Sequence, residues 1–131
     1  MTATHVLHWP DSELAGLTAD TPTTLRLRLA AAHCHRADDG LVGYLRPVEL
    51  VFHAATWQGD GPALGGIAEG HLLCGGQPLG PVGQGLPLPL DCHGAVVCRL
   101  RLISGTVLQI TAGRVVVQPG EDARFRESFA C

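Results

Sequence analysis

The strongest constraint on this chain is an alternating pattern that occurs twice. The tetrapeptide Arg-Leu-Arg-Leu stands at 26–29 and again at 99–102, and each copy lies within a longer alternating run, 24–30 and 97–103. Successive side chains of a β-strand point to opposite faces, so each run places its Leu residues on one face and its Arg residues on the other. The two runs therefore predict β-strands with one buried face and one basic, solvated face.

The first run predicts a strand over 23–33 that is followed by an antiparallel partner. Asp39-Gly40 favours a tight turn, because Gly readily adopts positive φ. We expect residues 42–56 to return beside the first strand, with a phase shift near Pro47. A proline cannot donate to a central ladder, so this position requires an edge or a bulge.

The second run belongs to the clearest hairpin in the sequence. Ser104-Gly105 separates two segments of strong β-formers, 95–103 and 106–117. Residues 86–90 alternate Leu with Pro, which confines them to an edge strand or an extended segment. Residues 121–129 fit either a short helix, with acidic residues at its start, or an extended tail.

Length and composition favour one β domain over residues 1–131. The chain has 131 residues, of which 46% are hydrophobic, and its 17 Gly and 9 Pro residues punctuate the apolar runs. About seven or eight short strands with regular turn signals and at most one short helix are typical of an all-β fold. We expect a single-domain antiparallel β-sandwich, with a small barrel as the alternative.

The charge pattern argues against several partner classes. All nine basic residues are Arg, and the chain has no Lys and no Asn, which points to a bacterial genome rich in GC. The net charge of −3 and the absence of a basic block argue against nucleic-acid binding. The sequence shows neither a signal-peptide pattern nor an apolar stretch of membrane-spanning length, so we expect a cytoplasmic protein without membrane partners.

The cysteines give no sign of nucleophilic catalysis. Their number is odd, their spacing is irregular, and in a reducing cytosol we expect free thiols. The neighbours Cys92 and His93 would point to opposite faces of a strand, so they form no catalytic pair by themselves. We therefore name no catalytic residue and expect a protein that is not an enzyme. The five cysteines are Cys34, Cys74, Cys92, Cys98 and Cys131.

Histidines provide the candidate metal ligands. His33 and His35 lie two residues apart and would share one face of a strand, while His71 and His93, with Cys92, offer further ligands. A zinc or iron site needs three or four such groups around one ion. Nothing in the spacing requires these residues to meet, so we assign no cofactor, and a metal-dependent enzyme or sensor is an alternative reading.

The same histidines resemble the opening of a known motif. Cupin-type double-stranded β-helix enzymes carry His-x-His followed by Glu, and His33 and His35 are similar to that start, although no Glu follows. Their second motif resembles 75–83, where a Gly and a Pro-x-Gly stand at matching spacing, but Leu86 occupies the place of the His. The resemblance covers about a quarter of the chain and implies a sandwich-like fold.

Whether the two Arg rows form one binding surface depends on whether their strands are neighbours. If the two strands are neighbours, their four Arg side chains form one patch that could hold an anion or an acidic protein partner. If the strands are apart, each Arg pairs with a local carboxylate or covers apolar surface. The candidate patch consists of Arg26, Arg28, Arg99 and Arg101.

Together these patterns predict a small non-catalytic binding or interaction protein. Low charge content and proline-marked strand edges favour self-association as a homodimer. A second alternative is a small-ligand binder with Trp9, Trp57 or Tyr44 at the mouth of an interior pocket. Neither the ligand nor the partner follows from the sequence.

Overall fold

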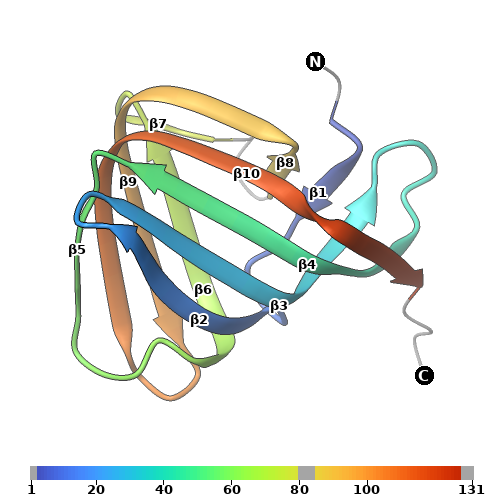
Figure 1. Cartoon of the computed structure of the whole chain (residues 1–131). Helices are drawn as coiled ribbons and strands as arrows, with labels where there is room; N and C mark the ends of the chain where they lie inside the picture. Colours follow the sequence, from blue (N-terminus) through green and yellow to red (C-terminus); the bar gives the residue numbers. More distant parts are fainter. Residues whose placement is uncertain (1–2, 80–84, 128–131) are drawn as a thin grey trace.

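The computed structural model describes residues 3–79 and 85–127, which form ten β-strands and no helix (Figure 1). No helix long and apolar enough to cross a membrane occurs in this part of the chain. The strands are β1 (His5–Leu7), β2 (Glu13–Thr21), β3 (Thr24–Arg36), β4 (Val42–His53), β5 (Thr56–Gly59), β6 (Gly65–Cys74), β7 (Gln77–Pro78), β8 (Leu86–Leu88), β9 (Leu90–Leu102) and β10 (Val107–Glu127).

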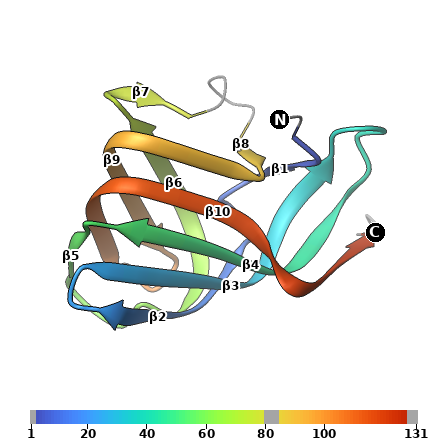
Figure 2. The same ribbon diagram turned by 45° about the horizontal axis from the view of Figure 1, so that its top comes forward.

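Six of these strands form a closed antiparallel ring. The hydrogen-bonded order runs β2–β6–β9–β10–β4–β3, and β3 pairs again with β2. The short contact between β2 and β6 closes the ring, through Glu13 opposite Gly66 and Leu14 opposite Gly65. Figure 2 shows the strands surrounding a common interior. The predicted all-β antiparallel class is confirmed, and the ring corresponds to the small-barrel alternative, with more strands than expected.

The alternating runs form strands as predicted, and their Leu residues are the core. Leu25, Leu27 and Leu29 of β3 are fully buried, and so is Leu100 of β9. Phe52 of β4 lies opposite Leu25 in the antiparallel register and is also fully buried. Every inward row thus meets apolar neighbours inside the ring, and this burial is the main stabilising contribution to the fold.

The turns and the edge strands also agree with the predictions made from the sequence. The predicted hairpin joins β9 to β10, and Gly105 adopts the positive φ of 98° that its turn requires. Strand β8 stands at the end of the strand order, as its prolines predict. β10 stays extended to Glu127, so the extended alternative holds for 121–127, while Phe129 lies outside the described residues. Homodimer formation at an edge stays a prediction.

In three neighbouring strands, the alternation of buried and exposed positions is interrupted at the same height of the sheet. In β3 the buried positions move from Leu29 to Ala32, and in β4 they move from Val48 to Leu45. The pairing of β10 with β4 shifts register between Pro119 and Arg124, opposite Pro47, so the bulge predicted near this proline is confirmed.

Beyond this level the same sheet continues past the ring as a short projecting part, which we call the extension. It consists of β1 with the ends of β3 (32–36), β4 (42–46) and β10 (124–127), and Figure 2 shows it projecting past the barrel. Its two faces follow from the phase shift. Cys34 and Leu45 continue the buried side, and therefore His33, His35 and Tyr44 lie on the outer side.

Trp9 packs against the inner surface of β6. Trp9 is 7% exposed and lies two residues after the end of β1. A Cβ atom on Gly70 would lie 2.6 Å from the Trp9 ring and 2.7 Å from Leu100, so only glycine permits this approach. The indole thereby ties the connection between β1 and β2 to the barrel.

Candidate functional site

A cavity of about 590 Å³ lies between the β1–β2 connection and strands β6, β7 and β8. Ligand-binding pockets of proteins commonly have volumes in this range and combine apolar walls with a few polar groups. Trp9 forms one wall, and the others come from Leu72 and Leu73 of β6, Leu79 after β7, and Leu86 of β8. The walls can therefore take an apolar or aromatic group.

Four ionisable side chains add the polar part of the cavity lining. They are His8 and Asp11 from the β1–β2 connection, His33 from β3 and His71 from β6. These groups come from three separate parts of the chain, and the ring closure brings them to one opening. The cavity can thus hold an apolar body and also hydrogen-bond a polar group.

His8 is the central member of a histidine cluster. Its Nε2 lies 2.8 Å from Nδ1 of His35, so one of these nitrogens donates a hydrogen bond and the other accepts it. The ring centroid of His8 lies 5.6 Å from that of His33, whose centroid is 5.5 Å from that of Tyr44. Sequence reasoning missed His8, because it lies outside both alternating runs and 25 residues or more from its partners.

Gly85 fits closely against the same cluster. Its φ is +85°, and a Cβ atom there would collide with the carbonyl oxygen of Leu7. That Cβ atom would also lie 3.1 Å from Nδ1 of His8, the nitrogen that His35 does not engage. Glycine at this position therefore permits the chain to pass close to Leu7 and His8.

Burial lowers the pKa of His8 from its usual value, and the neighbouring imidazoles of His35 and His33 lower it further. The pKa of His5 is lowered by burial and then by Arg36. When the pKa of a histidine is lower in the folded protein than in the unfolded chain, the unfolded chain binds the proton at a higher pH. Acid then lowers the free energy of unfolding. His8 is therefore mainly neutral at pH 7 and able both to donate and to accept a hydrogen bond.

We expect the folded state to lose stability as the pH falls below about 6.5, the ordinary histidine pKa. Urea unfolding followed at pH 7.5 and pH 5.5 measures this loss as a lower midpoint at the acidic pH. His8→Gln keeps a hydrogen-bonding side chain without the titration and should reduce the difference between the two midpoints. If the midpoint fell equally between pH 7.5 and pH 5.5 in His8→Gln and in the wild type, the loss of stability could not be assigned to His8.

The predicted metal candidates are only partly brought together. His33 and His71 line the same cavity, and His35 contacts His8, but His93 lies elsewhere on β9. Among the residues that the structure describes, no three His, Cys, Asp or Glu side chains are grouped as metal ligands. Within the cluster, His8 and His35 share a hydrogen bond.

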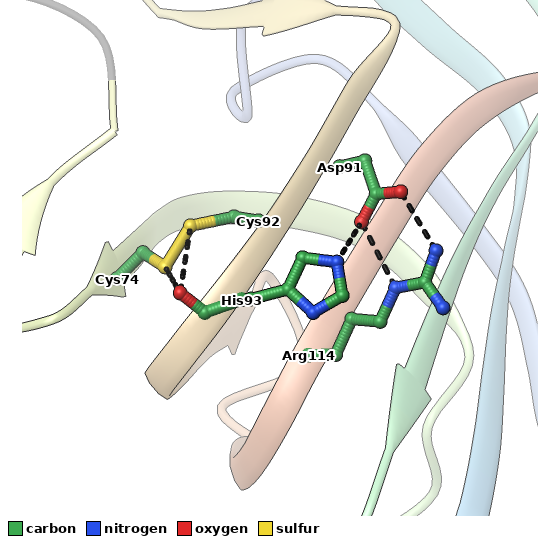
Figure 3. Close-up of polar contacts among 5 residues, drawn as sticks. All are labelled: Cys74, Asp91, Cys92, His93 and Arg114. Carbon is green, nitrogen blue, oxygen red and sulfur yellow. Dashed lines mark hydrogen bonds and ion pairs between the residues drawn. A yellow bond between two sulfur atoms is a disulfide. The ribbon is translucent and has the colours of Figure 1, made fainter.

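His93 belongs to a surface ion-pair group on β9 and β10 (Figure 3). Asp91 accepts two hydrogen bonds from Arg114, at 2.9 and 2.7 Å, and its Oδ1 lies 3.5 Å from Nε2 of His93. Arg114 holds the pKa of Asp91 below its usual range through these hydrogen bonds. The group is exposed, and its contribution to stability is small.

The expectation of five free thiols is wrong for two cysteines. Cys74, at the end of β6, is joined to Cys92 of β9 by a disulfide (Figure 3). The pairing of β6 with β9 places Cys74 opposite Val96, and Gly94, with a positive φ of 131°, lies between Val96 and Cys92. The Cα atoms of the two cysteines, which are 18 positions apart in sequence, are 6.7 Å from each other. Cys34 and Cys98 are free and buried, as small hydrophobic residues often are, and Cys131 lies outside the described residues.

The two Arg rows lie apart. Strands β3 and β9 are separated by β4 and β10 on one side of the ring and by β2 and β6 on the other. The condition for one patch of Arg26, Arg28, Arg99 and Arg101 is therefore not met. Arg26 pairs with Asp20 and Glu49, and Arg101 with Glu69, while Arg28 and Arg99 are exposed on their strands.

The three aromatic candidates have different surroundings. Trp9 lines the cavity, as the small-ligand alternative requires. Trp57 of β5 borders a separate, smaller hollow with Thr56 and Gln109, and Tyr44 packs beside His33 on the extension.

Comparisons of the chain with protein-family models, with curated proteins and with solved structures found no match. The site is therefore interpreted from its own geometry.

Proposed function

We propose that this protein binds a small amphipathic ligand in the cavity beside Trp9. The observation that carries the proposal is the composition of the cavity walls. Trp9 and the leucines from β6 and β8 offer apolar contact, and His8, His33 and His71 lie on the same lining. A preformed apolar pocket with a few convergent polar groups is the usual form of a small-molecule site.

The lining also indicates the class of ligand. Burial keeps His8 mainly neutral at pH 7, so it can hydrogen-bond a carbonyl, a hydroxyl or an acidic group of the ligand. Trp9 is well placed for an aromatic or aliphatic body, because its indole is held against Gly70 and cannot retreat into the barrel. A compact molecule that combines ring surface with one polar or anionic group fits both features.

The anionic ring compound 8-anilinonaphthalene-1-sulfonate serves as a probe of this site. We expect its fluorescence to rise on binding to the folded protein, and a larger side chain in the cavity wall should weaken this binding. Leu79→Phe narrows the cavity and is expected to weaken the probe affinity about tenfold, equivalent to about 1.4 kcal/mol.

Leu64→Phe is the matched control for this experiment. Leu64 is 60% exposed, and it lies in the loop before β6, outside the cavity lining. The control variant should bind the probe like the wild type. Equal weakening in both variants, or no probe binding to the folded protein, would contradict the proposed function.

A further inference from the structure

The outer face of the extension carries a second feature, which adjoins the cavity at His33. Arg46 of β4 lies directly opposite Arg124 of β10, and Arg126 lies opposite Tyr44. All three Arg side chains are exposed. Directly opposed residues of an antiparallel pair point to the same face, with Cβ atoms about 5 Å apart. The three guanidinium groups therefore share one small area of the surface.

The inner-face contacts of the neighbouring residues confirm this orientation. Phe125, between the two Arg residues of β10, packs on the ring of His5 at 5.4 Å between centroids, and the guanidinium carbon of Arg36 lies 5.2 Å from the Phe125 ring centroid. Side chains alternate along a strand, so Arg124 and Arg126 point to the opposite, outer face.

Aromatic and imidazole rings lie beside these charges. Tyr44 stands between Arg126 and His33 in the strand register, and His33 continues to the cluster with His8 and His35. We call this surface the outer basic face: Tyr44, Arg46, Arg124, Arg126, His33 and His35. It combines fixed positive charge with ring surfaces.

The nearby carboxylates whose positions are described do not neutralise this face. Asp39 pairs with Arg36 at 2.7 Å, and Glu127 alternates with Arg126, which places it on the inner side. Among the described side chains, Arg46, Arg124 and Arg126 form no ion pair. Like charges placed directly opposite each other in a sheet are destabilising, and a bound polyanion would remove that cost.

We propose that the outer basic face binds single-stranded nucleic acid. The Arg side chains contact successive phosphates, and Tyr44 with the neighbouring imidazoles stacks on unpaired bases. Charge and stacking rings on one exposed sheet surface are the two components of single-strand recognition. An acidic peptide would use the charges but leave the rings without a partner. The net charge of −3 argues against a broad basic surface, so the proposed contacts are confined to these three Arg residues and the rings beside them.

The test is fluorescence anisotropy of a labelled oligothymidine of about 15 nucleotides, titrated at several salt concentrations. Three phosphate contacts predict that the logarithm of the association constant falls with the logarithm of salt concentration with a slope of about −2. The double variant Arg124→Ser/Arg126→Ser should reduce this slope to about −0.7, because one contact remains.

Variants of Tyr44 distinguish the contribution of stacking to nucleic-acid binding from the contribution of charge. Tyr44→Leu is expected to weaken binding at least about fivefold at constant salt slope, while Tyr44→Phe keeps the ring and the affinity. Arg101→Ser is the matched charge control, because Arg101 lies on β9 and is paired with Glu69. It should leave both affinity and slope unchanged.

Three results would overturn the proposal. The first is the absence of oligothymidine binding at low salt. The second is equal weakening by Arg101→Ser and by the double variant. The third is a duplex or a polyglutamate peptide that competes as well as the single strand. The oligonucleotide assay does not use the ring probe, so its failure is distinguishable from failure of the cavity proposal.

Discussion

Replacing Phe52 with Ala is expected to lower the free energy of unfolding by about 3–5 kcal/mol. Phe52 is the bulkiest of the fully buried side chains, and its strand β4 lies between β3 and β10 in the ring. In the strand register it faces Leu25 on one side and Val115 on the other, both fully buried. Truncation removes apolar burial and leaves a cavity that the closed ring cannot easily fill.

Val51→Ala is the control for this prediction. Val51 precedes Phe52 on β4 and points to the outside of the ring, where it is half-buried. We expect its free energy of unfolding to fall by about 1 kcal/mol or less. Urea unfolding of both variants measures the difference. Equal losses would contradict the assignment of inward and outward rows on β4.

Removing the disulfide is expected to lower the free energy of unfolding by about 3 kcal/mol. Cys74 and Cys92 are separated by 18 positions, and their link restricts the unfolded chain over that loop. In the folded state the link fastens the end of β6 to β9, beside the short strand β7 that carries Pro78 to the cavity. The double variant Cys74→Ser/Cys92→Ser should unfold at lower urea concentration than the oxidised wild type.

Thiol titration provides the chemical check. The denatured wild type should show three thiols before reduction and all five after it. In the folded protein burial raises the pKa of Cys34 to about 11 and that of Cys98 to about 12, so both should react slowly. Five thiols in unreduced, denatured protein would show that the disulfide is absent.

Sequence alternation predicted the strands but not how they close. The Leu rows of β3 and β9 are local patterns, and they identified both strands and their buried faces. Ring closure depends on two residue pairs between β2 and β6, where Gly65 and Gly66 provide no alternating signal. A contact between distant segments with so weak a local pattern could not be predicted from one chain.

The candidate site could be predicted only in part for the same reason. His33 and Trp9 were identified from residue type, and the structure places both at the cavity. The outward direction of His33 depends on the phase shift after Leu29, which interrupts the alternation. Cys74 and Cys92 meet only through the pairing of β6 with β9, so their spacing alone gave no sign of the bond.

The most direct test of the cavity proposal is an NMR titration of the histidine ring signals with 8-anilinonaphthalene-1-sulfonate. The chain has seven histidines, which act as separate reporters, and three of them, His8, His33 and His71, line the cavity. We predict that these three signals shift together and saturate, while those of His53 and His93 stay in place. Shifts of His53 and His93 with unchanged signals from the cavity histidines would contradict ligand binding beside Trp9.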